Sequence, residues 1–512
     1  MSRRPAARRA VAVIAGVLGL SALAPAPVLA HAIGGTFQLP VPLTLYLGGA
    51  AAAVAASFVV TALVSRRAGP PSYPMARVAD GLAGLVRLAL RTIGLVWWYG
   101  AIVVGFVVGD ISPLPAVLLW IGIWVGMPIV AVLLGNPWPS FSPFRTTFDE
   151  LEWLGKRLGF ERLDAGLSYP TRLARWPAVG LLAVGIWAEL VLPGSSAAAT
   201  VAWLMLGYTI LTLGGMMAFG QVAWLRNAEL FEVELGWFGR LGPIGRRGVS
   251  PALCDGCHEA CDPARCIDCP ECSVAADDEE RQPVVRPWVV GLTDVDRAGW
   301  SDAAFIVLAL AGVSFDGLGD TSFGARLLGI VQPAVIGVLG PSANAFLLAD
   351  TAIFLIVASA FAAAFLLVVG LTHMLGERAS RRPLATTAGA YAATLLPIAA
   401  GYLIAHYLTI AVQGAVWLPS LILDPMNSLA PMLDWLPVEL VWYLSVVAIV
   451  GGHIAGIVLA HRNALRDAPS RSILAGLPMV ALMIGYTVLS LWIIAQPIVV
   501  EPGAGPPAAL LP

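Results

Sequence analysis

The chain has 512 residues, of which 58% are hydrophobic and only 12% are charged. Soluble proteins carry about 25% charged residues, so we exclude a soluble enzyme, a coiled coil and a disordered scaffold. The 30 basic residues are matched by 32 acidic ones, and this balance argues against nucleic acid as a partner. Apolar runs of about twenty residues recur along the whole chain, which predicts a polytopic protein of the lipid bilayer.

Residues 1–30 are typical of a secretory signal peptide. Four arginines precede an apolar stretch, and Val28 and Ala30 suit the positions before a cleavage site. Cleavage would leave His31 at the N-terminus, where its imidazole and the free amine could chelate a metal. The other interpretation is that His31 simply follows the cleavage site and has no such role. An uncleaved first helix is the alternative.

The apolar runs predict an all-α fold, a bundle of about ten transmembrane helices. Five spans form an N-terminal membrane half, residues 31–220, and five form a C-terminal half, residues 301–499. Between them lies an insert at 221–300, and a Pro-rich tail follows at 500–512. The predicted spans are 42–64, 92–110, 114–134, 177–193, 198–220, 302–317, 345–374, 387–412, 438–460 and 473–497.

Charge predicts the orientation of these spans. With the mature N-terminus outside, 25 of the 30 Lys and Arg residues fall in inside loops, four lie in the signal, and only Arg326 lies outside. This bias follows the positive-inside rule. It predicts a protein of the cell membrane whose insert lies in the cytoplasm and whose C-terminus lies outside. The apolar segment 323–340 contains Arg326 and Pro333, and we interpret it as a re-entrant or interfacial helix, because a further span would reverse the charge pattern.

All six cysteines lie within one short stretch of the insert. Their spacing is C-x2-C-x3-C-x4-C-x2-C-x2-C, and a histidine is interleaved. Cytoplasmic thiols stay reduced, and a polar segment with few apolar residues gains its order from a metal. We predict structural zinc, with an iron–sulfur cluster as the alternative, although the C-x3-C-P ending of a ferredoxin run is missing. The predicted metal ligands are Cys254, Cys257, Cys261, Cys266, Cys269, Cys272 and His258. An acidic linker follows.

Ionisable side chains inside the spans indicate a second site. Tyr402 and His406 share one helical face, and Asp316 and Glu189 fall in the same outer half of the bilayer as His406. Such groups are costly in lipid unless a partner, water or a metal compensates them. We predict an outward-facing cavity lined by these four residues with His453 at its floor. A divalent metal there would take His406 and Asp316 as ligands, and Glu189 would orient or deprotonate a water. Hydrogen bonding between helices is the alternative role for each histidine.

The next span carries a ridge of small residues, Gly452, Gly456 and Ala460, which predicts close helix packing.

Several stretches together resemble a known family. These stretches are His31–Gly35, Leu39–Leu43, Asn136–Arg145, Tyr169-Pro170, Arg175–Pro177, Ser314–Gly317, Pro397–Tyr407, Gly452-His453 and Ala460-His461. Through them the chain is similar, over nearly its whole length, to the polytopic membrane proteins of actinobacteria and haloarchaea labelled fenitrothion hydrolase. The resemblance implies hydrolysis of an organophosphate ester, and it carries over no catalytic residues.

Three functions remain open from the sequence. The first is a metal-dependent hydrolase of an apolar phosphoester, in which a bound metal supplies hydroxide and the substrate enters from the lipid. The second is a transporter or metal-handling permease, which broken helices and polar groups at mid-membrane depth also fit. The third is a membrane assembly or scaffold protein with the insert as its docking module. Nothing in the sequence identifies protein partners.

Overall fold

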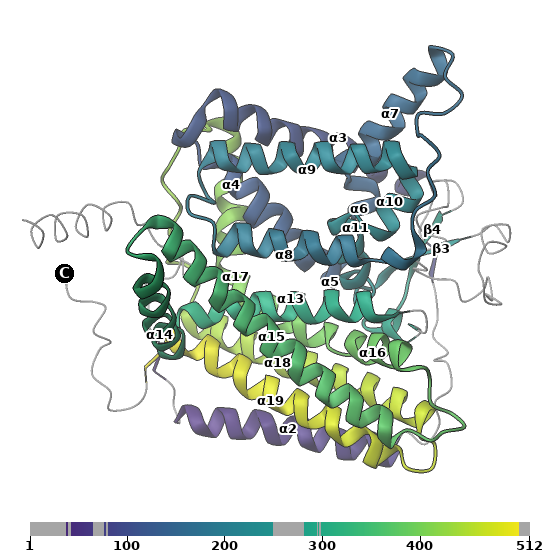
Figure 1. Cartoon of the computed structure of the whole chain (residues 1–512), viewed down its shortest axis with the longest axis vertical. Coiled ribbons are helices and arrows are strands. Elements are labelled where there is room, and N and C mark those ends of the chain that lie inside the picture. Colours follow the sequence, from purple (N-terminus) through teal and green to yellow (C-terminus); the bar gives the residue numbers. More distant parts are fainter. Residues whose placement is uncertain are drawn as a thin grey trace, which may run out of the picture.

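The computed structural model describes residues 37–38, 42–64, 76–77, 80–248, 281–293, 295 and 298–500. The predicted signal peptide, His31, the cysteine cluster with His258, the acidic linker and the tail after residue 500 lie outside the described residues. Within them the chain forms the predicted all-α bundle, and most helices run along one common direction (Figure 1).

The helices follow the predicted spans closely, with a few short elements between them. The long helices are α2 (Leu43–Val64), α3 (Asp80–Val107), α7 (Pro143–Arg157), α8 (Trp176–Leu190), α9 (Ala198–Phe219), α13 (Trp300–Gly319), α14 (Ser322–Leu339), α15 (Ala343–Leu375), α16 (Leu384–Ala393), α17 (Leu396–Leu423), α18 (Val438–Asp467) and α19 (Ser472–Ile498). The shorter helices are η1 (Gly109–Ile111), α4 (Leu114–Ala116), the π-helix η2 (Val117–Gly126), α5 (Met127–Leu133), α6 (Trp138–Phe141), η3 (Thr171–Leu173), α10 (Gln221–Asn227), α11 (Leu230–Phe238) and η6 (Val290–Leu292).

Ten helical segments among the described residues are long and apolar enough to cross a membrane. The chain is therefore an integral membrane protein. By length, this set includes α14 and leaves out α8, which has 15 residues. Figure 1 places α8 alongside α13, with which it is in contact, whereas α14 lies across one end of the bundle. The re-entrant or interfacial placement of residues 323–340 stays a prediction.

Short strands mark the two ends of the bundle. At one end, which we call the terminal end, β1 (Phe37–Gln38) pairs in parallel with β5 (Val499–Val500), so the first and last membrane helices begin and end side by side. At the other, the insert end, β2 (Ala76–Arg77), β3 (Ile244–Gly248) and β4 (Arg281–Val285) form a sheet in the order β2-β4-β3. The positive-inside prediction assigns the insert end to the cytoplasm.

The predicted ridge of small residues packs α18 against the start of α17. A Cβ atom on Gly456 would lie 2.7 Å from the carbonyl oxygen of Thr394, and one on Gly452 would overlap the carbonyl of Pro397. By contrast, nothing lies within 4 Å of a Cβ placed on Gly451. Only glycine allows this approach of the two backbones. The chain breaks between α16 and α17, directly before Pro397.

Buried ion pairs fix the helices at the insert end. Arg382, before α16, pairs with Asp467 at the end of α18 through hydrogen bonds of 3.0 and 2.8 Å. Arg175, before α8, pairs with Asp302 in the first turn of α13. This second pair sets α8 against α13, and these two helices carry Glu189 and Asp316 of the site described next.

Candidate functional site

A cluster of polar side chains joins α13 to α17 near the terminal end. Asp316 Oδ2 accepts a hydrogen bond of 2.7 Å from the Tyr407 hydroxyl and lies 3.0 Å from His406 Nε2. The ring centroids of Tyr402 and His406 are 5.8 Å apart. The side chain of His406 is 6% exposed and that of Asp316 is 24% exposed, so the cluster is enclosed on the histidine side and partly open at the carboxylate. The structure thus brings together three of the residues predicted for the membrane site, His406, Asp316 and Tyr402.

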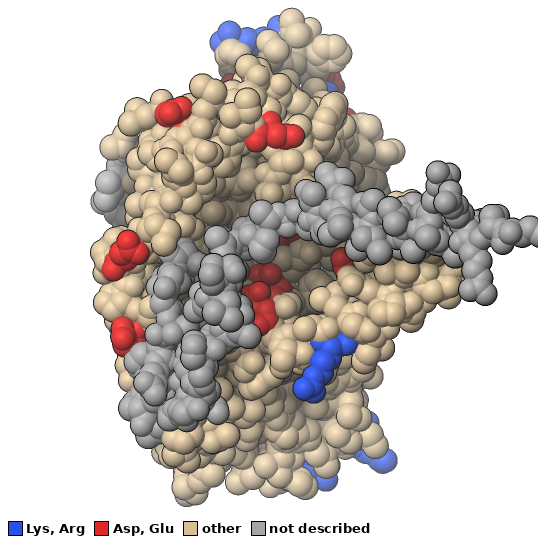
Figure 2. Space-filling model, turned by 90° about the vertical axis from the view of Figure 1, so that its left-hand side faces the viewer, with Lys and Arg blue, Asp and Glu red and all other residues tan. Residues whose placement is uncertain are grey.

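The terminal end of the bundle is hollowed. Figure 2 shows this face, and acidic side chains lie within the hollow while basic side chains lie at its margins. Asp316 belongs to the last turn and a half of α13, whose C-terminal end reaches this face. A cation arriving from this side would therefore meet negative charge before it met the apolar interior.

A small cavity lies deeper, between α8, α11, α13, α17 and η2. Its volume is about 30 Å³, which is room for about one water molecule. Three ionisable side chains reach it from three different helices: Glu189 from α8, Glu234 from α11 and Tyr407 from α17. Lys and Arg are absent from its lining. Because Tyr407 also bonds Asp316, the cavity and the polar cluster are joined by one hydroxyl group.

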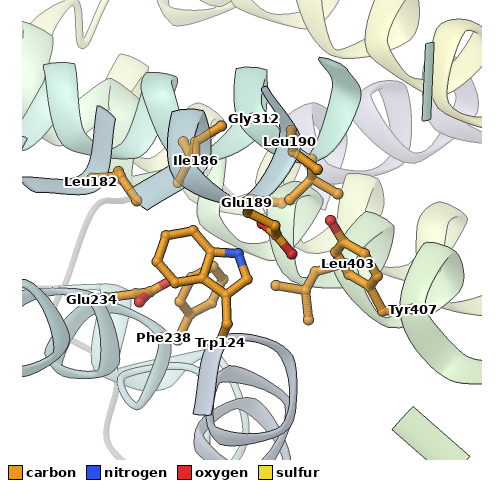
Figure 3. A pocket seen from close by; sticks show the side chains of 13 residues that line it. Trp124, Leu182, Ile186, Glu189, Leu190, Glu234, Phe238, Gly312, Leu403 and Tyr407 are labelled. Atoms are coloured by element: carbon orange, nitrogen blue, oxygen red, sulfur yellow. The ribbon is translucent and has the colours of Figure 1, made fainter. Parts of the chain in front are cut away.

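Trp124 stands inside this cavity. Figure 3 shows its indole ring with Glu189 on one side and Glu234 on the other. The indole nitrogen is on the side of the ring that faces Glu189. A Cβ on Gly185 would lie 2.6 Å from the ring, so a glycine in α8 makes the room for it. Trp124 belongs to the π-helix η2, and π-helical turns are frequent at functional sites because the extra residue per turn redirects side chains.

Two further carboxylates lie at the N-terminal end of α11. Glu229 caps this helix by accepting hydrogen bonds from the backbone N–H groups of Phe231 and Glu232. It also accepts from the Tyr208 hydroxyl at 2.5 Å and from Trp138 Nε1 at 3.0 Å.

Glu232 lies 3.4 Å from Arg145 of α7. The carboxylates at the start of α11 therefore lie close to a buried arginine, towards the insert end.

Burial changes the acidity of the carboxyl groups of α11, a helix too short to span a bilayer. Loss of hydration raises the pKa of Glu229 to about 7. Loss of hydration, with a smaller contribution from the charge of Glu229, raises the pKa of Glu234 to about 8. The side-chain oxygen Oε2 of Glu234 is buried and has no hydrogen-bond partner within the described part of the chain. Both groups therefore exchange protons near neutral pH.

The sequence prediction missed these carboxylates because it assigned residues 221–300 to a cytoplasmic insert. A usable signal was present: α11 reads Leu-Phe-Glu-Val-Glu-Leu-Gly-Trp-Phe, an apolar run with two embedded acids. Acids in such a run need burial partners, which a solvated loop would not require.

His453 does not line the cavity. Its Nδ1 lies 2.8 Å from the carbonyl oxygen of Ile449 in its own helix, its ring is fully buried, and its Nε2 has no hydrogen-bond partner in the described residues. Its neighbour Gly452 packs against α17, so His453 belongs to the contact between α17 and α18.

The membrane cluster gathers fewer than three metal-binding side chains among the described residues. Nowhere in the described ranges do three or more His, Cys, Asp or Glu side chains gather to hold a metal ion. His406 and Asp316 supply two donors, and a divalent metal usually takes four or more. Zinc at the cysteine cluster stays a prediction, because those residues lie outside the described ranges.

The chain was compared with protein-family models, with curated proteins and with solved structures, and none of them matches it. The fold and the arrangement of the buried carboxylates are therefore the basis for a functional proposal.

Proposed function

We propose that the protein is a membrane transporter for a small cation. One observation carries the proposal: acidic side chains follow one another through the bundle. The Tyr407 hydroxyl donates to Asp316 and reaches the cavity that Glu189 and Glu234 also line, and Glu229 caps the helix that carries Glu234. The series starts at the hollow of the terminal end and finishes beside Arg145 towards the insert end. Acidic residues inside a membrane are costly and usually mark the path of an ion or a proton.

Hydrolysis of an apolar phosphoester, which the resemblance to the fenitrothion hydrolase family implies, is less well supported. Pockets for drug-sized ligands have volumes of about 300–1,000 Å³, whereas the cavity has room for about one water. A hydrolase would also have no use for carboxylates that continue towards the insert end. A scaffold role gains no specific support from the geometry.

A separate proposal concerns the cysteine cluster of the insert. We propose that it binds zinc, with an iron–sulfur cluster as the alternative, and that it orders the insert.

Transport and hydrolysis can be separated in one preparation. Purified protein would be reconstituted in liposomes, and uptake of H⁺, Na⁺, Mn²⁺ or Zn²⁺ would be followed with ion-specific dyes under an imposed membrane potential. Detergent-solubilised protein would be assayed with a chromogenic phosphotriester. We expect flux of one of these cations, its loss in Asp316→Asn, and unchanged flux in Asp434→Asn, which alters an exposed carboxylate. Phosphotriester turnover without any cation flux would overturn the proposal.

A further inference from the structure

We infer that the cation is a proton, and that it is relayed between Glu189 and Glu234 past the indole of Trp124. This inference rests on the proposed transport function and names its substrate. It follows from the size of the cavity, the donors that line it and one carboxylate oxygen that has no partner.

The geometry favours a proton over a metal ion. The two carboxylates of the cavity come from α8 and α11 and stand on opposite sides of Trp124 (Figure 3). They do not converge on one point, as the ligands of a cation must. The cavity volume of about 30 Å³ leaves room for about one water and none for a hydrated metal ion. Because the indole ring stands between the two carboxyl groups, a water in the cavity passes the proton around the ring.

Glu234 is the group that accepts the proton. Its Oε2 is buried without a hydrogen-bond partner in the described residues, and the residue is 6% exposed. The charged and titratable groups around it are Glu189 from α8, Tyr407 from α17 and Glu229 from its own end of α11. None of these groups is cationic. An unpaired buried carboxylate is unfavourable, and protonation removes its charge.

The relay needs no group beyond those already described. A proton enters at Asp316, which is partly exposed and hydrogen-bonded to His406 and Tyr407. It passes to Glu189 through the cavity, where Tyr407 and a water can carry it. It then passes to Glu234. In each transfer one O–H bond breaks on the donor as one forms on the acceptor.

On the insert side of Glu234, Glu229 accepts hydrogen bonds from Tyr208 and Trp138, and Glu232 lies 3.4 Å from Arg145. The relay ends when the O–H bond of Glu234 breaks and a water on that side takes the proton. Each carboxyl group has then returned to its starting state.

The experiment measures proton flux into liposomes that contain a pH-sensitive dye, driven by a potassium diffusion potential. Wild-type protein is compared with Glu189→Gln, Glu234→Gln and Glu234→Asp, and with Glu161→Gln as an exposed matched control. An amide cannot take up or release a proton in this range. We expect both glutamine variants to lose flux by about tenfold or more, the aspartate variant to keep part of it, and the control to equal wild type.

Each result bears on a different claim. Proton flux in Glu234→Gln equal to wild type would overturn the relay. Wild-type flux of Mn²⁺, Zn²⁺ or Na⁺ without protons would also overturn it, yet would leave the transporter proposal intact. The absence of flux of any cation would overturn both the relay and the transporter proposal. Should Glu234→Gln fail to fold, infrared titration of wild-type protein supplies the second measurement: the relay requires a buried carboxyl that changes protonation near neutral pH, and its absence contradicts the proposal.

Discussion

The raised pKa of Glu234 predicts how stability depends on pH. The folded protein binds a proton at this carboxyl up to about pH 8, whereas the unfolded chain releases it near the ordinary glutamate value of about 4.3. Between these two values the folded state holds more protons than the unfolded state. The free energy of unfolding therefore falls as pH rises through this window. Glu229 acts in the same direction up to about pH 7.

The size of the effect follows from the proton linkage. One bound proton changes the free energy of unfolding by roughly 1.4 kcal/mol per pH unit, so raising the pH from about 6 to about 8 costs roughly 2 kcal/mol from Glu234. The midpoint of thermal unfolding, followed by tryptophan fluorescence in detergent, should fall by a few degrees over this range. Glu234→Gln should show a flatter profile, because the amide carries no titrating proton.

The matched control is Glu161→Gln, which replaces an exposed carboxylate in the loop after α7. It should keep the wild-type slope. If Glu234→Gln melts with the same dependence on pH as wild type and the control, then Glu234 is not protonated in the folded state at neutral pH, and the reasoning that links its burial to proton uptake is refuted.

Three further predictions concern other parts of the chain. Gly452→Ala should destabilise the protein by roughly 1–3 kcal/mol through overpacking against α17, while Gly451→Ala, which meets no neighbour within 4 Å, should be nearly neutral; equal melting midpoints for the two variants would contradict the close packing of α17 and α18. Replacing Cys266 and Cys269 together with Ser should remove the metal bound by the insert, measured by elemental analysis, and unchanged metal content would reject a metal at the cluster. A reporter that is active only outside the cytoplasm should be silent when fused at Ala276, and its activity there would reverse the predicted orientation.

The helices could be predicted from the sequence because a membrane span is a local property. Each span needs only a run of apolar residues of the right length, and the structure confirms the bundle. The proximity of His406 to Asp316 could also be predicted, because the depth of each residue in the membrane can be counted from the end of its helix. Both predictions depend only on positions along single helices and on the fact that all the spans cross the same bilayer.

The carboxylates of α11 could not be predicted in the same way. Glu229 and Glu234 follow the last span of the N-terminal half, and α11 is too short to register as a span. The burial of Glu229 depends on contacts with Tyr208 and Trp138, and that of Glu234 depends on packing against other helices around the cavity. The position of Trp124 between two carboxylates depends on a π-helical turn, and composition does not distinguish that turn from an α-helix. These features arise from tertiary packing rather than from local pattern.

The pairing of β3 with β4 brings together the two points at which the chain enters and leaves the cysteine-bearing segment. Gly248 and Arg281 are direct partners in the sheet, and neighbouring strands lie about 5 Å apart. Residues 249–280 therefore leave and rejoin the protein at a single point. Replacing them by a two-residue hairpin turn would leave the membrane helices and their connections unchanged. Evolution could exchange or lose this segment in one event without disturbing the carboxylate series, and a variant shortened in this way would carry the membrane activity alone.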